Sequence, residues 1–177
     1  MSTAWDISTS SYDSVSFATG ISIPNGLAFK PDGTRLFMSG YTGATDKPIR
    51  QVDLSTAWDL STATYNSVTF DTSQVLGQVS STDFPTSLHL NSDGTKIFVS
   101  TKGSDKIYEY AMSTAYDLST ISYNNVEFSV TAQEQDLYGI TFSNDGTKMY
   151  AFGYNDTVYQ YSTSTSLAFN AADVGKK

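Results

Sequence analysis

The sequence of 177 residues contains no cysteine and a single histidine, His89. The lack of cysteine excludes disulfide bridges, a thiolate nucleophile and a zinc site with cysteine ligands. A single histidine excludes metal sites built from several imidazoles, and it leaves one candidate base for a Ser-His-Asp triad. The sequence also carries no cofactor-binding motif. We therefore expect no bound metal, no cofactor and no enzymatic activity.

Basic residues are scarce, since 10 lysines and arginines stand against 18 acidic residues, for a net charge of −8. The only basic cluster is Lys176-Lys177, so we expect neither nucleic acids nor membranes as partners. No apolar run approaches the roughly 20 residues of a transmembrane helix, and no signal peptide is visible. The compartment stays open. The cytoplasm is the default, but a virion protein or a trimmed secreted protein has the same features.

Aromatic residues are abundant, at 14% of the sequence, with 12 tyrosines and 10 phenylalanines. Together with many serines and threonines, this composition is typical of strands and turns, because helical proteins use more Ala, Leu, Glu and Lys. The 39% of hydrophobic residues is enough for a core, and the length fits one domain. We expect a single all-β domain over residues 1–177.

Two motifs recur three times each. The first reads Ser-Thr-Ala-(Trp/Tyr)-Asp-(Ile/Leu)-Ser-Thr, and a Tyr-x-x-Val-x-Phe segment follows each copy. The first motif begins at residues 2, 55 and 113, and the segments lie at 12–17, 65–70 and 123–128. The second motif joins two alternating runs through an Asp-Gly pair, which is the strongest short signal for a β-hairpin. These pairs are Asp32-Gly33, Asp93-Gly94 and Asp145-Gly146. We expect each glycine at positive φ and each aspartate to cap its own turn.

The motifs predict four short antiparallel strands in each repeat. Two strands form the hairpin, a third follows it, and Tyr-x-x-Val-x-Phe supplies the fourth. The third strands begin at Ile49, Ile107 and Val158. The Ser-Thr-Ala-Trp-Asp insert before the fourth strand can form one short helical turn at most. Four-stranded units of this kind are the blades of a β-propeller.

The hairpin Pro31–Phe37 and its copies resemble the blade hairpins of the YVTN/lactonase-like and WD-repeat β-propellers. Residues 153–159 resemble the turn between the second and third strands of such blades. The resemblance covers residues 12–161 and implies the fold. The Gly-His pair of WD repeats is absent, and Trp-Asp follows the third strand instead of ending it. No catalytic set of a lactonase-like enzyme can be transferred to this chain.

Three blades are too few to close a ring, because propellers have four to eight. The first repeat is preceded by a spare fourth strand, and the last repeat lacks one if residues 161–167 align with 52–58. In the competing alignment, residues 167–169 form a short fourth strand. We expect a six-bladed ring in a homodimer, where Tyr12, Val15 and Phe17 complete the partner's last blade. A nine-bladed trimer and a longer parent array are the alternatives. The predicted segments are 1–19 (exchanged strand), 20–71, 72–129 and 130–170 (blades), and 171–177 (tail).

Ligand-binding residues are expected on the loop face opposite the Asp-Gly hairpins, because those loops differ among the repeats. The longest of these loops spans residues 71–86. His89 lies on the first strand of its blade, where it either faces the central channel or is a tolerated substitution at a position that holds Ala28 and Thr141 in the other copies. The Asp-Gly turns lack the ligand spacing of a calcium loop. The recurring Trp5, Trp58 and Tyr116 are expected to cover the edge of each blade. The candidate ligand-binding residues are Tyr41, Asp46, Asp83, Phe84, Lys102, Asp105, Tyr154 and Asp156.

These observations predict a non-enzymatic binding or scaffold propeller that assembles with itself and has a glycan or a protein as its ligand. A first alternative is a lactonase-like or other hydrolase with a carboxylate site at the channel mouth. Its carboxylates would be Asp46, Asp83, Asp105 and Asp156. A second alternative is a folding unit, a natural fragment or an engineered chain, with no ligand.

Overall fold

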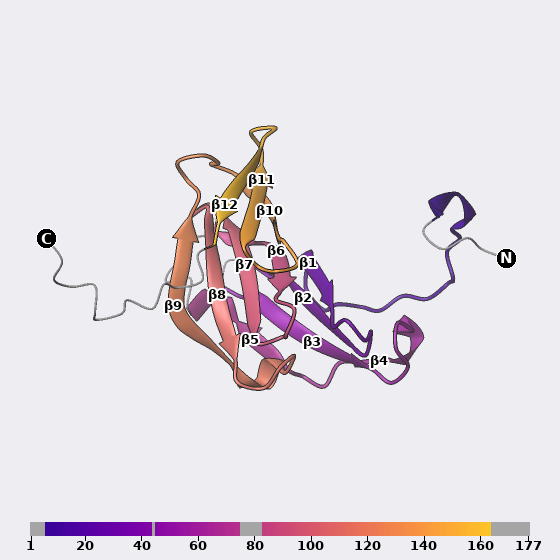
Figure 1. Ribbon diagram of the computed structural model, residues 1–177. Helices are drawn as coiled ribbons and strands as arrows, with labels where there is room; N and C mark the ends of the chain where they lie inside the picture. The colour runs from indigo at the N-terminus through magenta and orange to yellow at the C-terminus, as the bar shows by residue number, and fades with distance from the viewer. Residues whose placement is uncertain (1–5, 44, 75–82, 164–177) are drawn as a thin grey trace, which may run out of the picture.

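The structure, a computed structural model, describes residues 6–43, 45–74 and 83–163. Its strands form three antiparallel sheets that stand side by side, with β1, β6 and β10 as neighbouring inner strands (Figure 1). Blade 1 contains β1 (Ile23–Phe29), β2 (Arg35–Tyr41), β3 (Pro48–Leu54), β4 (Ala63–Thr64) and β5 (Thr69–Asp71). Blade 2 contains β6 (Phe84–Leu90), β7 (Lys96–Lys102), β8 (Lys106–Met112) and β9 (Ile121–Ser129). Blade 3 contains β10 (Leu137–Phe142), β11 (Lys148–Gly153) and β12 (Val158–Ser162). The expected all-β architecture with three blade-like sheets is confirmed.

The Asp-Gly hairpins fold as the sequence predicts. Gly33, Gly94 and Gly146 have φ angles of 74°, 71° and 69°. In each turn the aspartate carboxylate accepts a hydrogen bond from the threonine amide two residues later, at 2.9–3.0 Å. Side-chain hydrogen bonds from Lys30, Thr95 and Ser143, together with the amide hydrogen bonds, lower the pKa of Asp32, Asp93 and Asp145 respectively, that of Asp145 to about 2. A left-handed glycine and an aspartate cap therefore fix the same turn three times.

The repeated insert forms a single 3-10 turn in each copy, as expected. Three such turns are η1 (Ile7–Thr9), η2 (Leu60–Thr62) and η4 (Leu118–Thr120), and a further one, η3 (Thr72–Gln74), follows β5. The aromatic residue before η2 and η4 covers the hairpin of its own blade. Trp58 lies over Gly33 and Tyr116 lies over Gly94, so close that a Cβ atom on either glycine would overlap the ring. Trp5, at the corresponding place before η1, lies outside the described residues.

The largest core cluster fills the junction between blades 1 and 2. Phe37 and Ile49 of blade 1 are fully buried there against Val99, Tyr110 and Leu118 of blade 2. A smaller cluster, which includes Ile107, Leu137 and Met149, joins blades 2 and 3. Burial between adjacent sheets, and not within one sheet, thus holds the blades together.

Residues 6–22 belong to no sheet in the described part of the chain; η1 at their start lies away from the blades (Figure 1), whereas Thr19 accepts a hydrogen bond from Arg50 and Ile21 is buried against blade 1. Ile7 and Tyr12 are 88% and 75% exposed. Val15 is half-buried, and Phe17 packs partly against the outer cluster of blade 1. The exchange of this segment between two chains stays a prediction.

Candidate functional site

Two carboxylates predicted on the loop face tie neighbouring loops together. Asp105, at a φ of 50°, accepts a hydrogen bond from the Leu137 amide at 3.0 Å. Asp83 accepts one from the Ser104 hydroxyl at 3.1 Å. Both aspartates are buried, and burial raises the pKa of Asp105 above its usual value, with nearby acidic side chains adding to the rise. Asp105 therefore ties a loop of blade 2 to blade 3, and Asp83 ties two loops of blade 2 to each other.

Glu134 is a loop-face residue that the sequence did not single out. Its side chain is fully buried, and the carboxylate accepts hydrogen bonds from the amides of Gln135, Asp136 and Asn155 at 3.0–3.3 Å. Three backbone donors arranged in this way offset the free-energy cost of removing the Glu134 carboxylate from water. The only sequence signal for it was its position in a variable loop between blades.

Lys102 is the centre of a polar and aromatic group at the loops of blades 2 and 3. Its ammonium lies 3.2 Å from the Asp136 carboxylate and 5.0 Å from the centre of the Tyr138 ring. Hydrogen bonds to Asp136 and to the Tyr138 hydroxyl raise the pKa of Lys102. Tyr154 is 71% exposed, and its amide donates to the Asp136 carbonyl at 3.1 Å. Of this group, the sequence analysis named Lys102 and Tyr154 and missed Asp136 and Tyr138.

The remaining candidates lie apart from this group. Tyr41 and Phe84 stack with ring centres 4.6 Å apart and join the loops of blades 1 and 2. The Asp46 carbonyl accepts a hydrogen bond from the Thr42 amide, and Asp156 is an exposed turn residue with a φ of 51°. The centre of the long loop, residues 75–82, lies outside the described residues.

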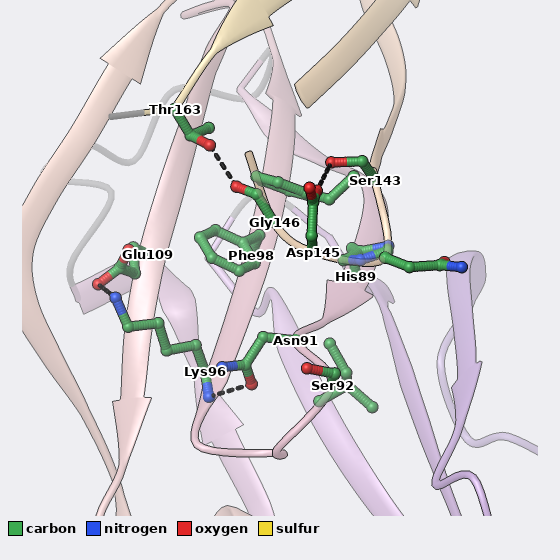
Figure 2. Close-up of a pocket in the computed structure, with 13 residues that line it drawn as sticks. His89, Asn91, Ser92, Lys96, Phe98, Glu109, Ser143, Asp145, Gly146 and Thr163 are labelled. Carbon is green, nitrogen blue, oxygen red and sulfur yellow. Dashed lines mark hydrogen bonds and ion pairs between the residues drawn. The ribbon is translucent and has the colours of Figure 1, made fainter. Parts of the chain in front are cut away.

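A second candidate region is a groove between blades 2 and 3 at the Asp-Gly end, with a volume of about 690 Å³ (Figure 2). Lys96 and Glu109 form an ion pair of 2.8 Å in this interblade groove. The groove continues into an apolar hollow of about 410 Å³ beside Ile107 and Phe128, and Phe98 and Glu109 line both parts. The sequence analysis did not predict this groove.

His89 lies in the wall of the interblade groove, with its ring centre 5.0 Å from that of Phe142 in blade 3. This contact places the imidazole of His89 between blades 2 and 3. Burial lowers the pKa of His89 because the imidazolium loses hydration there. The role of His89 in a channel stays a prediction.

Within the described segments, no three His, Asp or Glu side chains gather closely enough to hold a metal ion. Over the same segments, no helix has the length and apolar character needed to cross a membrane.

Solved structures resemble this chain over about four-fifths of its length. A crystal structure titled as a putative 6-phosphogluconolactonase from Bacteroides uniformis matches with a TM-score of 0.57 and 14% identity, covering 81% of this chain and 38% of that one. The periplasmic gluconolactonase PpgL of Pseudomonas aeruginosa matches with a TM-score of 0.55 and 18% identity, covering 81% and 36%. A Swd1 β-propeller domain of Myceliophteria thermophila has a TM-score of 0.47 and 14% identity, covering 78% and 39%.

The likenesses to the two lactonase structures, with TM-scores of 0.57 and 0.55, support the class of fold that the hairpins indicated. The chain spans less than two-fifths of the length of the lactonase structures it matches. No protein-family model matches the sequence, and no curated protein matches it. At 14–18% identity the likeness to lactonases concerns the fold alone and carries no activity to this chain.

Proposed function

We propose that this chain is a non-enzymatic scaffold propeller whose two outer blade faces join copies of the chain into a closed, six-bladed homodimer. One observation carries the proposal. Apolar repeat positions that are buried where blade 1 meets blade 2 are exposed on the outer face of blade 3 and, at Leu27, on that of blade 1. The outer faces therefore have the residue pattern of a blade junction without a neighbouring blade in the described chain.

The outer face of blade 3 has the register of the buried face of blade 1. Ser39 pairs with Ile49 in blade 1, and both are fully buried. Phe152 pairs with Val158 at the same positions of blade 3, and these side chains are 49% and 68% exposed. Phe152 and Val158 thus expose apolar surface at positions where the corresponding pair of blade 1, Ser39 and Ile49, is buried against blade 2.

The outer face of blade 1 shows this contrast at Leu27 alone, because its other apolar residues, such as Met38, are buried in a cluster with Ile21 of the same chain. Leu88, which pairs with Val99, is 6% exposed inside the junction. Leu27, which pairs with Met38 in the same register, is 63% exposed. Soluble monomers rarely leave large apolar patches uncovered. Joining the face of blade 3 to that of blade 1 in a second copy covers both, and a two-fold axis then closes the ring.

The ring would present the loop face as its binding surface. Tyr154 and Tyr138 are exposed aromatic residues beside the Lys102–Asp136 ion pair, a combination that suits a glycan or a polar protein surface. The lactonase alternative receives less support, because the carboxylates of Asp83 and Asp105 already hold loop hydrogen bonds.

The test places a charge on each outer face. Leu27→Glu and Val158→Glu change exposed side chains, so each variant should fold normally and lose self-association, because the carboxylate would be buried without a partner. Thr45→Glu, on an exposed loop, is the matched control. Sedimentation equilibrium over a range of concentrations measures the association. Equal association of all four proteins, or none by the unmodified chain, would refute the proposal.

A further inference from the structure

The internal junction shows how an insert docks on the preceding blade. The Leu118 amide at the start of η4 donates to the Gln51 side-chain oxygen of blade 1 at 2.8 Å. The Leu118 side chain is 1% exposed in the core between the two blades. On the same insert, the Tyr116 carbonyl accepts a hydrogen bond from the Arg35 guanidinium at 2.6 Å. The insert of blade 2 therefore binds blade 1 in two ways. The Leu118 side chain is buried between the blades, and the backbone of the insert forms hydrogen bonds with the Gln51 and Arg35 side chains of blade 1.

The interblade groove occupies the corresponding place on blade 2. Lys96 begins β7 as Arg35 begins β2, and Glu109 pairs with Phe98 as Gln51 pairs with Phe37. In the described part of the chain, Glu109 pairs with Lys96 (Figure 2) and accepts a hydrogen bond from the Asn124 side-chain amide at 2.7 Å, and no insert docks on either side chain.

The apolar wall of the groove is likewise exposed in the described part of the chain. Val68 and Phe70 of blade 1 pack against the core cluster that contains Leu118. Their counterparts on blade 2, Val126 and Phe128, are 47% and 46% exposed. The groove is therefore a repeat of the Leu118 site, with a donor, an acceptor and an apolar wall in place.

The N-terminal segment already has the shape of a docked insert. Asp6 caps η1 at φ −99° and ψ 96°, and its carboxylate accepts from the Ser8 amide at 3.0 Å. Asp117 caps η4 at φ −113° and ψ 99° and accepts from the Ser119 amide at the same distance. Ile7, the counterpart of Leu118, is 88% exposed.

The likeness continues beyond the 3-10 turn. Ser14 has a φ of 60°, and Asn125, at the same repeat position within β9, has a φ of 59°. In blade 2, the Tyr123 ring before this bend packs on Tyr110, with ring centres 5.5 Å apart. Tyr12 is the counterpart of Tyr123 and Tyr161 is the counterpart of Tyr110. The backbone of the N-terminal segment thus matches that of the insert and outer strand of blade 2, although it pairs with no sheet in the described part of the chain.

We propose that residues 6–17 of a second copy dock on this chain, with Ile7 in the interblade groove and Tyr12 beside Tyr161 on β12. The Glu109 carboxylate accepts the Ile7 amide, as the Gln51 side-chain oxygen accepts the Leu118 amide in the first junction. This inference rests on the self-association proposed above and identifies the segment that locks it. The groove repeats, between blades 2 and 3, the junction already formed by blades 1 and 2, which is why an equivalent segment fits it.

The chain's own residues 164–169 are the competing occupant, and they lie outside the described residues. Up to Thr163 the backbone follows the repeat, since its amide donates to the Thr147 carbonyl as that of Met112 donates to Thr95. Beyond this point, Ala168 takes the place of the capping aspartate. Because a cap of this kind stabilises the turn, the sequence favours the N-terminal segment, which keeps Asp6.

The test uses the full chain with Ile7→Asp, the conservative Ile7→Leu, and Ser11→Asp as an exposed control. Ile7→Asp should weaken the association at least tenfold, because a buried isoleucine contributes about 1.5–3 kcal/mol. Ile7→Leu restores the residue found at positions 60 and 118 and should associate like the unmodified chain. Equal association constants for Ile7→Asp and Ser11→Asp would overturn the docking and leave the joined blade faces standing.

A second measurement separates docking from ring formation. A labelled peptide of residues 1–19 is titrated with the full chain and with its Phe98→Asp variant, whose change lies in the groove wall. Saturable binding that weakens at least tenfold in Phe98→Asp, and with an Ile7→Asp peptide, is expected. Such binding by a chain that stays monomeric would support the docking and refute the ring. No binding, or binding that neither change affects, would overturn the docking.

Discussion

The junction between blades 1 and 2 and the groove between blades 2 and 3 are built from the same repeat but differ in what fills them. At the first junction Leu118 is fully covered, whereas the corresponding groove exposes Val126 and Phe128. The ring of Tyr116 covers Gly94, whereas no described atom lies near the space above Gly146. The contrast shows that a repeated motif folds its hairpin locally, while the burial of its apolar face depends on the next insert.

The largest expected effect compares Gly94→Val with Gly146→Val. Both glycines have positive φ, which disfavours a β-branched residue, but only the Gly94 substitution also collides with an aromatic ring. Gly94→Val should cost about 3 kcal/mol or more, from backbone strain and overpacking together. Gly146→Val should cost about 1–2 kcal/mol, from strain alone. Urea unfolding measures both, and equal losses would show that the Tyr116 ring does not cover Gly94.

The next comparison concerns Asp105 and Asp156, which share a φ of about 50° in corresponding turns. Asp105→Ala leaves the buried Leu137 amide without its acceptor and should cost about 1–3 kcal/mol. Asp105→Asn keeps an acceptor oxygen, tolerates positive φ and should have little effect. Asp156→Ala changes an exposed carboxylate and should cost less than Asp105→Ala. A larger loss for Asp156→Ala than for Asp105→Ala would contradict this comparison.

Tyr110 offers a substitution that should do no harm. Its hydroxyl is buried in the first junction without a hydrogen-bond partner in the described residues, and burial raises the pKa of Tyr110 far above its usual value. Tyr110→Phe removes an unpaired polar group and keeps the ring, so thermal unfolding should show unchanged stability or a gain of up to about 1 kcal/mol. A loss greater than 1 kcal/mol would mean that the hydroxyl has a partner in solution.

The smallest effect is expected at His89 in the groove wall. Burial lowers the pKa of His89 in the folded state below the roughly 6.5 of the unfolded chain. The unfolded chain therefore binds the proton more readily, and stability should fall as the pH drops from 7 through 6.5 toward the lower folded pKa. His89→Thr, which installs the residue found at position 141, should remove this part of the pH dependence. Melting curves between pH 5 and 8 compare the two proteins, and parallel profiles would contradict the assignment.

The parts of the fold that could be predicted are those encoded by local chemistry. Asp93-Gly94 specifies its hairpin because glycine accepts positive φ and aspartate caps the turn, and the Asp-Leu-Ser-Thr insert at 117–120 specifies its own 3-10 turn. The unpredicted parts depend on contacts between blades. Glu134 and Asp136 became recognisable only when the loops of blades 2 and 3 met, and the groove beside Glu109 required the packing of two sheets. Residues 167–169, for which two alignments compete, lie outside the described residues.

The mass of the intact chain in solution tests the central claim most directly. Sedimentation equilibrium or native mass spectrometry should give twice the chain mass of 19.2 kDa, as a closed six-bladed homodimer requires. A mass of three chains would keep the joined blade faces but refute the six-bladed ring. A stable monomer of 19.2 kDa at every concentration would contradict the account, because Leu27 on blade 1 and Phe152 and Val158 on blade 3 would then remain exposed.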